Sequence, residues 1–116
     1  MLLLVPMKKR GRKSKKSAGE RLDAVYDKIR AEVGENRPLF HGATVDGWKL
    51  HMATSDFGDL GVFVQRGEGE ALEIIGFSAG EEAGEWYPAT MLAEPAGLAL
   101  VADLCERAEW HDKLPT

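Results

Sequence analysis

The side chains best suited to hold a metal ion or to do nucleophilic and acid–base chemistry are three histidines and one cysteine: His41, His51, His111 and Cys105. A tetrahedral zinc site needs converging ligands, usually at short spacings such as C-x₂-C, and no such spacing occurs here. A single cysteine forms no internal disulfide and is typical of a reducing compartment, where Cys105 would be a small core residue. We therefore expect neither a metal site nor a cofactor.

Carboxylates are the other group with chemical potential, and they cluster in glycine-rich turns: Asp56 with Asp59, Glu68 with Glu70, and Glu81 and Glu82 with Glu85. Two carboxylates act as acid and base only where a cleft separates their pKa values, whereas carboxylates in turns are usually solvated. The sequence contains no G-x-S-x-G, Walker-type or H-E-x-x-H motif. These patterns predict a protein that is not an enzyme.

Charge divides the chain into two parts. Residues 1–17 carry seven cations and no acid, whereas residues 18–116 carry 8 basic and 19 acidic side chains. The cations of the first part are Lys8, Lys9, Arg10, Arg12, Lys13, Lys15 and Lys16. A run of like charges cannot bury itself, so residues 1–17 are predicted to be a basic tail that is disordered when free. Its natural partner is a nucleic acid, because each cation that reaches a phosphate releases condensed counterions.

Within the tail, Arg10-Gly11-Arg12-Lys13 resembles the core of AT-hook segments, in which a glycine flanked by arginines fits the DNA minor groove. The resemblance implies that these residues contact a duplex. Two other interpretations stay open: a tail that serves solubility or targeting, and a tail that folds back onto its own acidic body. The apolar run from Leu2 to Val5 precedes the basic residues, which is the reverse of a signal peptide, and Met7 is an alternative translation start.

The body is expected to begin with a helix over residues 18–33. Ser17 and Glu20 have the spacing of a capping box, in which each side chain satisfies the backbone N–H of the other residue. Apolar residues then recur along one face, at Leu22, Val25, Tyr26, Ile29 and Val33. Gly34 is suited to end the helix in a left-handed cap.

Alternation with period two follows and predicts an antiparallel hairpin of residues 39–45 and 48–53 around Asp46-Gly47, a dipeptide typical of two-residue turns. The expected register pairs Val45 with Trp48, Ala43 with Leu50, and His41 with Met52. Its apolar face consists of Leu39, Ala43, Val45, Trp48, Leu50 and Met52. His41 would be a partly buried, hydrogen-bonded residue on this face, and His51 lies on the opposite face, so the two histidines cannot share a ligand.

Further strands are expected over residues 60–65, 71–77 and 86–92, the last at an edge because Pro88 has no N–H to donate. A final helix begins at Pro95, with Leu98, Val101, Cys105 and Ala108 on its buried face. The predicted fold class is α+β, an antiparallel four- or five-stranded meander sheet flanked by an N-terminal and a C-terminal helix that pack on one face. One domain is expected to span residues 18–112.

Most aromatic residues fall in the expected strands: Phe40, Trp48, Phe63, Phe77, Trp86 and Tyr87. Aromatic side chains on a sheet can stack single-stranded bases. The order of strands followed by a helix near Glu94-Pro95 resembles a family of small single-strand DNA-binding coactivators with basic tails, and this resemblance implies binding on the sheet. Lys49 and Arg66 are, however, the only cations of residues 39–92. Because an acidic sheet repels a nucleic acid, we expect these aromatics to form the core.

Together these features favour a non-enzymatic nucleic-acid-associated accessory or regulatory protein, suited to a bacterium or phage, whose tail contacts phosphates and whose acidic body contacts a protein. The alternative is a protein-interaction or inhibitor module whose acidic face binds a basic partner, without nucleic-acid binding. No segment has the roughly 18 apolar residues of a membrane span. We therefore expect no membrane partner and a cytoplasmic location, with the nucleoid as one site within it, and homo-oligomerisation stays open.

Overall fold

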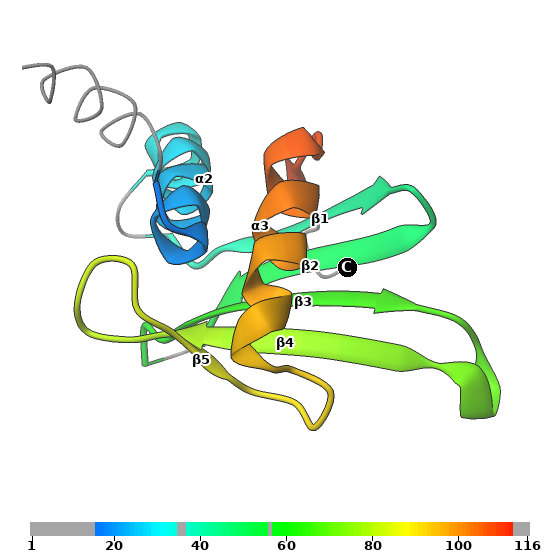
Figure 1. The fold of residues 1–116 in the computed structure, drawn as a ribbon. Helices are drawn as coiled ribbons and strands as arrows, with labels where there is room; N and C mark the ends of the chain where they lie inside the picture. The colour runs from blue at the N-terminus through cyan, green and yellow to red at the C-terminus, as the bar shows by residue number, and fades with distance from the viewer. Residues whose placement is uncertain (1–15, 35–36, 56, 113–116) are drawn as a thin grey trace, which may run out of the picture.

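The computed structural model describes residues 16–34, 37–55 and 57–112, so most of the expected tail lies outside the described residues. The described chain forms two α-helices and one six-stranded antiparallel sheet, and the fold is therefore α+β (Figure 1). The helices are α2 (Ala18–Val33) and α3 (Leu98–Arg107), with 3₁₀ turns η1 (Gly69–Ala71) and η2 (Pro95–Gly97). The strands are β1 (Phe40–Val45), β2 (Trp48–Thr54), β3 (Leu60–Arg66), β4 (Glu73–Ala79), β5 (Trp86–Pro88) and β6 (His111–Asp112).

The strands lie in the order β5-β4-β3-β2-β1-β6. Strands β1 to β5 form the expected meander, but the chain then returns past α3 to add β6 beside β1. The sheet therefore has six strands rather than the expected four or five, and the short strand β6 is the additional one. His111 lies in β6, opposite Gly42 of β1.

The hairpin of β1 and β2 has the predicted register, with Val45 opposite Trp48 and His41 opposite Met52. Asp46 and Gly47 both have positive φ, 50° and 84°, as a two-residue hairpin turn of this twist requires.

Two other strands differ from their expected bounds. Strand β4 begins at Glu73 rather than at residue 71, because residues 69–71 form the η1 turn. Strand β5 ends at Pro88 rather than at residue 92. Beyond it, the Ala89 N–H still donates to the Gly76 carbonyl at 2.8 Å, and the side chain of Thr90 also bonds to β4. Its hydroxyl accepts from the Gly76 N–H at 3.0 Å and donates to the Ile74 carbonyl at 2.8 Å.

Both helices cover the same face of the sheet and lie side by side (Figure 1). The predicted capping box opens α2: the Ser17 N–H donates to Glu20 Oε1 at 2.9 Å, and the Glu20 N–H donates to Ser17 Oγ at 3.2 Å. Gly34 ends α2 with a φ of 100°. Arg21 of α2 donates to the Glu106 carboxylate of α3 at 2.5 Å, which joins the two helices.

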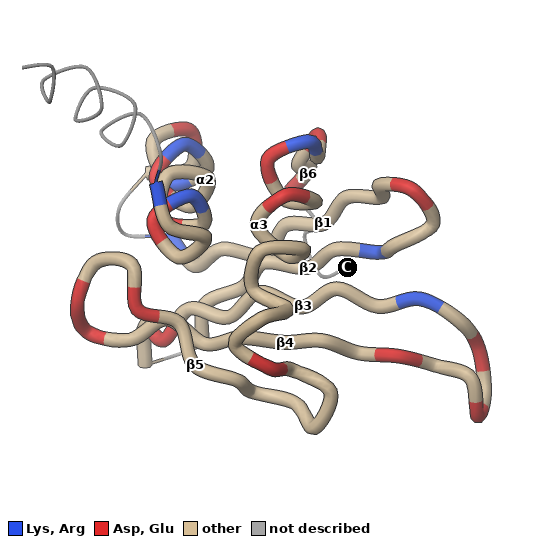
Figure 2. Tube along the Cα trace, viewed as in Figure 1, with Lys and Arg blue, Asp and Glu red and all other residues tan. Residues whose placement is uncertain are grey.

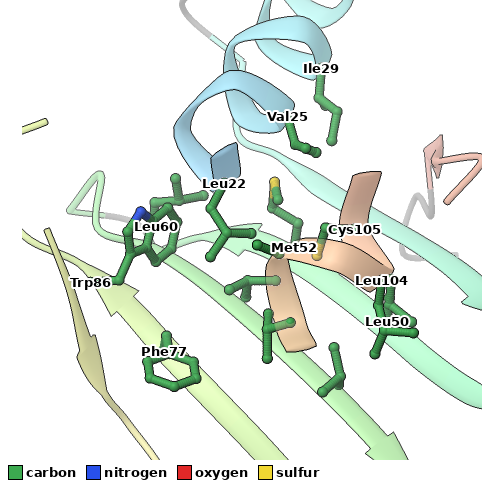
Figure 3. Packing of buried hydrophobic residues seen from close by; sticks show 14 of the residues in the cluster. Leu22, Val25, Ile29, Leu50, Met52, Leu60, Phe77, Trp86, Leu104 and Cys105 are labelled. Carbon is green, nitrogen blue, oxygen red and sulfur yellow. The ribbon is translucent and has the colours of Figure 1, made fainter. Parts of the chain in front are cut away.

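The core lies between the helices and this face (Figure 3). Its largest fully buried side chains are Leu22, Leu39, Leu50, Met52, Val62, Val64, Phe77, Val101, Leu104 and Cys105. Trp48 is also buried, and the Arg66 guanidinium lies 4.3 Å from the centre of its ring.

His41 departs from its expected environment. It is buried, with 6% of its surface exposed, and its Nδ1 has no hydrogen-bond partner among the described residues. His41 is therefore more deeply buried than expected, and its Nδ1 lacks the expected hydrogen bond. The imidazole faces the helix layer from β1, where its strand neighbour is the apolar Met52.

Candidate functional site

A groove lined by carboxylates opens between the first half of α2, the β2–β3 loop and the β4–β5 loop. Its volume is about 850 Å³, and its acidic lining residues are Asp23, Asp27, Asp59, Glu81, Glu82 and Glu85. Figure 2 shows the red acidic segments of α2 and of the β4–β5 loop facing each other across this region. The sequence marked the loop carboxylates as turn residues but gave no sign that α2 brings Asp23 and Asp27 to them.

Asp23 holds the walls of this acidic groove together. Its carboxylate accepts from the Gly84 N–H at 2.5 Å and from Trp86 Nε1 at 3.0 Å. Trp86 Nε1 also lies 3.1 Å from the carbonyl oxygen of Gly19. A Cβ at Gly19 would sit 1.9 Å from the Gly84 carbonyl oxygen, so helix and loop backbones touch. These contacts fix the position of the loop that carries the glutamates.

Among the described residues, no lysine or arginine lines the acidic groove. Tyr87 stands at its rim, and a hydrogen bond with the Glu85 carboxylate raises the pKa of its phenol. The other carboxylates face solvent without a cationic partner in the lining, so the groove is a concave negative surface. Such a surface attracts cations from a distance and favours a basic partner.

The basic tail begins beside this groove. Of its seven cations, Lys16 is described and exposed, whereas Lys8, Lys9, Arg10, Arg12, Lys13 and Lys15 lie outside the described residues. A Cβ at Gly84 would lie 3.8 Å from Ser17 Oγ, which places the start of α2 against the β4–β5 loop. Since an extended chain advances at most about 3.5 Å per residue, residues 8–16 can reach roughly 30 Å from this point.

The side of the sheet away from the helices forms a second candidate surface, here called the outer face. Its strand residues alternate with those of the core: Phe40, Gly42, Thr44, Lys49, His51, Ala53, Gly61, Phe63, Gln65, Ile74, Gly76, Ser78, Tyr87 and His111. This set contains no carboxylate. The strand carboxylates, Glu73 and Asp112, belong to the alternate set. The expectation of an acidic sheet is therefore wrong for this face.

Aromatic residues divide between the two faces. Trp48, Phe77 and Trp86 are buried in the core, whereas Phe40 and Tyr87 are 41% and 53% exposed on the outer face. Phe63 is half-buried at the centre of the outer face, opposite Gly76, and a Cβ at Gly76 would lie 2.3 Å from its Cδ2. The expectation that all strand aromatics form the core is thus correct for three of them only.

The histidines and the cysteine do not form a reactive cluster. His41 faces the core and His51 the outer face, as predicted from their register. Across the described ranges, no group of three or more His, Cys, Asp or Glu side chains is placed to hold a metal ion. Burial raises the pKa of the Cys105 thiol to about 12, so it stays protonated at neutral pH.

No protein-family model matches this chain, and neither a curated protein nor a solved structure shows significant similarity to it. Within the part of the chain that the structure describes, no helix is long and apolar enough to cross a membrane. The chemistry of the two surfaces and of the tail therefore carries the functional argument.

Proposed function

We propose that this chain is a non-enzymatic, nucleic-acid-associated accessory protein. Residues 8–16 contact phosphates, and the acidic groove binds a basic protein partner. The observation that carries this proposal is the division of charge: seven cations precede a body with a net charge of −11. The two parts meet at Ser17, where α2 starts beside the β4–β5 loop.

Counterion release explains why the tail favours a nucleic acid. Each tail cation that neutralises a phosphate releases condensed ions, and this gain does not depend on base sequence. The carboxylates of the body repel the same polyanion, so contact is confined to the tail and to surfaces that lack carboxylates. Binding should therefore be strongly salt-dependent, with little preference among duplex sequences.

A fluorescence anisotropy titration with a labelled duplex tests the tail. The full chain is compared with a variant in which all seven tail cations are replaced by Gln, at about 50 and about 200 mM salt. We expect the full chain to bind with a slope of log K against log salt no steeper than about −6, and the variant to lose binding. The control is Lys28→Gln, which removes one exposed cation of α2. Equal affinity of the full chain and the seven-site variant would overturn the assignment to the tail.

The acidic groove favours a second candidate function, a protein-interaction module that binds a basic partner and no nucleic acid. The test uses a synthetic peptide with the sequence of residues 8–16 as a basic probe. A triple variant, Asp59→Asn, Glu81→Gln and Glu82→Gln, removes groove charge but keeps Asp23 in its hydrogen bonds. A matched variant, Glu68→Gln, Glu70→Gln and Glu94→Gln, removes equal charge elsewhere. Peptide binding that only the groove variant loses, without duplex binding by the full chain, would place this candidate first.

A further inference from the structure

We propose that His51 and His111 bind a divalent transition-metal ion, such as Zn²⁺, on the outer face of the sheet. Such a site goes beyond the proposed nucleic-acid association and does not depend on it, because neither a phosphate nor a residue of the tail takes part. The two histidines lie far apart in the sequence, and only the addition of β6 to the sheet brings them together.

The register of three strands places both histidines beside one glycine. His51 of β2 and His111 of β6 each pair with Gly42 of β1, one from either side. Residues paired across antiparallel strands point to the same face, so both imidazoles stand on the outer face. Paired Cα atoms are about 4.5–5.5 Å apart, which puts the Cα atoms of the two histidines roughly 10 Å from each other. Since Gly42 has no side chain to stand between the rings, the two imidazoles can converge on one ion.

A hollow of about 550 Å³ lies at this place on the outer face. Both helices are on the other side of the sheet (Figure 1). His111 is exposed and His51 is half-buried, so an ion can reach both rings from solvent. The two histidines line the hollow together with Gly42, Ala43, Thr44, Lys49, Leu50 and Glu109.

The ligand type determines which ions fit. Imidazole suits Zn²⁺, Cu²⁺ and Ni²⁺, whereas Mg²⁺ and Ca²⁺ prefer oxygen ligands. Each ring has two nitrogens, so a histidine that hydrogen-bonds a neighbour through one nitrogen can bind an ion through the other, as is usual at metal sites. Within the described ranges, no third His, Cys, Asp or Glu is placed to complete the ligand set. The remaining positions are therefore left to water or to a ligand from solvent, which favours an exchangeable ion over a closed structural site.

Two other side chains that could compete for such an ion are out of its reach. His41 and Cys105 are both buried. Burial also raises the pKa of the Cys105 thiol to about 12, so it supplies no thiolate at neutral pH. The carboxylates of the acidic groove are oxygen ligands, which Mg²⁺ can occupy. Binding of Zn²⁺ in the presence of Mg²⁺ should therefore report on the two histidines of the outer face.

The test is a calorimetric titration of the full chain with Zn²⁺ in millimolar Mg²⁺, and we expect saturable binding. His51→Gln and His111→Gln should each weaken that binding at least about tenfold, because the loss of an outer-shell partner alone costs about 10- to 100-fold. The controls are His41→Leu, which removes an imidazole outside the site, and Lys49→Gln, which removes a lining residue that is not a ligand. Both controls should keep the binding. No saturable binding by the full chain, or equal affinity of the two histidine variants, would overturn the proposal.

Nuclear magnetic resonance of the imidazole nitrogens in the unmodified chain keeps the proposal falsifiable if a variant fails to fold. An ion bound to a ring nitrogen changes the chemical shift of that nitrogen. We expect Zn²⁺ to shift the ring nitrogens of His51 and His111 and to leave those of His41 unchanged. Changes at one histidine only, or at none, would overturn the proposal. Duplex binding by the full chain tests the proposed function separately, so either can fail while the other stands.

Discussion

The two faces of the sheet are built from alternate residues of the same strands, yet they obey different constraints. On the face under the helices, Leu50, Val62 and Phe77 are fully buried and packed against α2 and α3. On the outer face, the same strands carry glycines, half-exposed aromatics and no carboxylate. Packing explains the first face, because a core needs large apolar side chains in close contact. Folding does not demand the second composition, since charged residues are well tolerated on an exposed face. Packing alone therefore does not account for the composition of the outer face.

The largest expected effect is a loss of stability from a substitution on the sheet face under the helices. Trp48→Ala should destabilise the protein by about 3–5 kcal/mol, because it removes a buried aromatic and leaves a cavity. It also removes the ring beneath Arg66. Urea denaturation followed by circular dichroism measures the change, with Phe40→Ala on the outer face as the control. A loss below about 1 kcal/mol would mean that Trp48 does not belong to the core.

The next effect concerns the centre of the outer face. Gly76→Ala should cost about 1–3 kcal/mol, because the new Cβ would meet the Phe63 ring. Combining it with Phe63→Leu should recover part of that loss, so a double-mutant cycle should give a clear coupling energy. Gly97→Ala is the control, since nothing lies within 4 Å of a Cβ there. Strictly additive effects of the two substitutions would contradict the packing of Phe63 on Gly76.

The third effect concerns His41, whose Nδ1 is a buried polar atom without a hydrogen-bond partner among the described residues on the face under the helices. An unsatisfied buried nitrogen is unfavourable, and an apolar side chain of similar size removes it. We therefore expect His41→Leu to leave the free energy of unfolding unchanged or to raise it by up to about 1 kcal/mol. His41→Ala should instead destabilise, because it leaves a cavity. If His41→Leu destabilised as much as His41→Ala, Nδ1 would have a partner in the folded protein.

The smallest effect concerns the joint between the helices that cover the core. The hydrogen bond from Arg21 lowers the pKa of Glu106. The pair therefore stabilises the folded state above the ordinary carboxyl pKa, and this contribution is lost as pH falls through the lowered value. Because both side chains are partly exposed, it should stay below about 1 kcal/mol. Denaturation of the protein and of Glu106→Gln between pH 7 and pH 3 should give curves that converge at low pH.

The first helix and the hairpin could be predicted because each has a local signal with a physical cause. Ser17 and Glu20 set the start of α2, and Asp46-Gly47 set the register of β1 and β2. Strand β6 could not be predicted, since His111-Asp112 is too short for any period and gains its structure from pairing with β1. The predicted start of β4 was wrong because the η1 turn contains a residue, Ala71, that would suit a strand equally well.

The candidate surfaces were the least predictable part. In β3 the run of Val62, Phe63 and Val64 is apolar on both faces, so period two alone cannot tell which face Phe63 joins. The contacts with Gly61 and Gly76 decide it. The acidic groove collects carboxylates from three separate segments of the chain, and only tertiary structure brings these together. The basic tail could be predicted from the sequence alone, because a run of like charges is evident without any knowledge of tertiary structure.

The short outermost strands have a consequence for behaviour at high concentration. Strand β5 has three residues and ends at Pro88, and β6 has two. Unpaired N–H and C=O groups along a sheet edge are a template for strands of other molecules, and short or proline-containing edges remove that template. An open aromatic face on a sheet with long edges would invite growth into fibres. Here the outermost strands β5 and β6 are themselves too short to be such a template, whereas β1 beyond Gly42 keeps an edge that β6 does not pair.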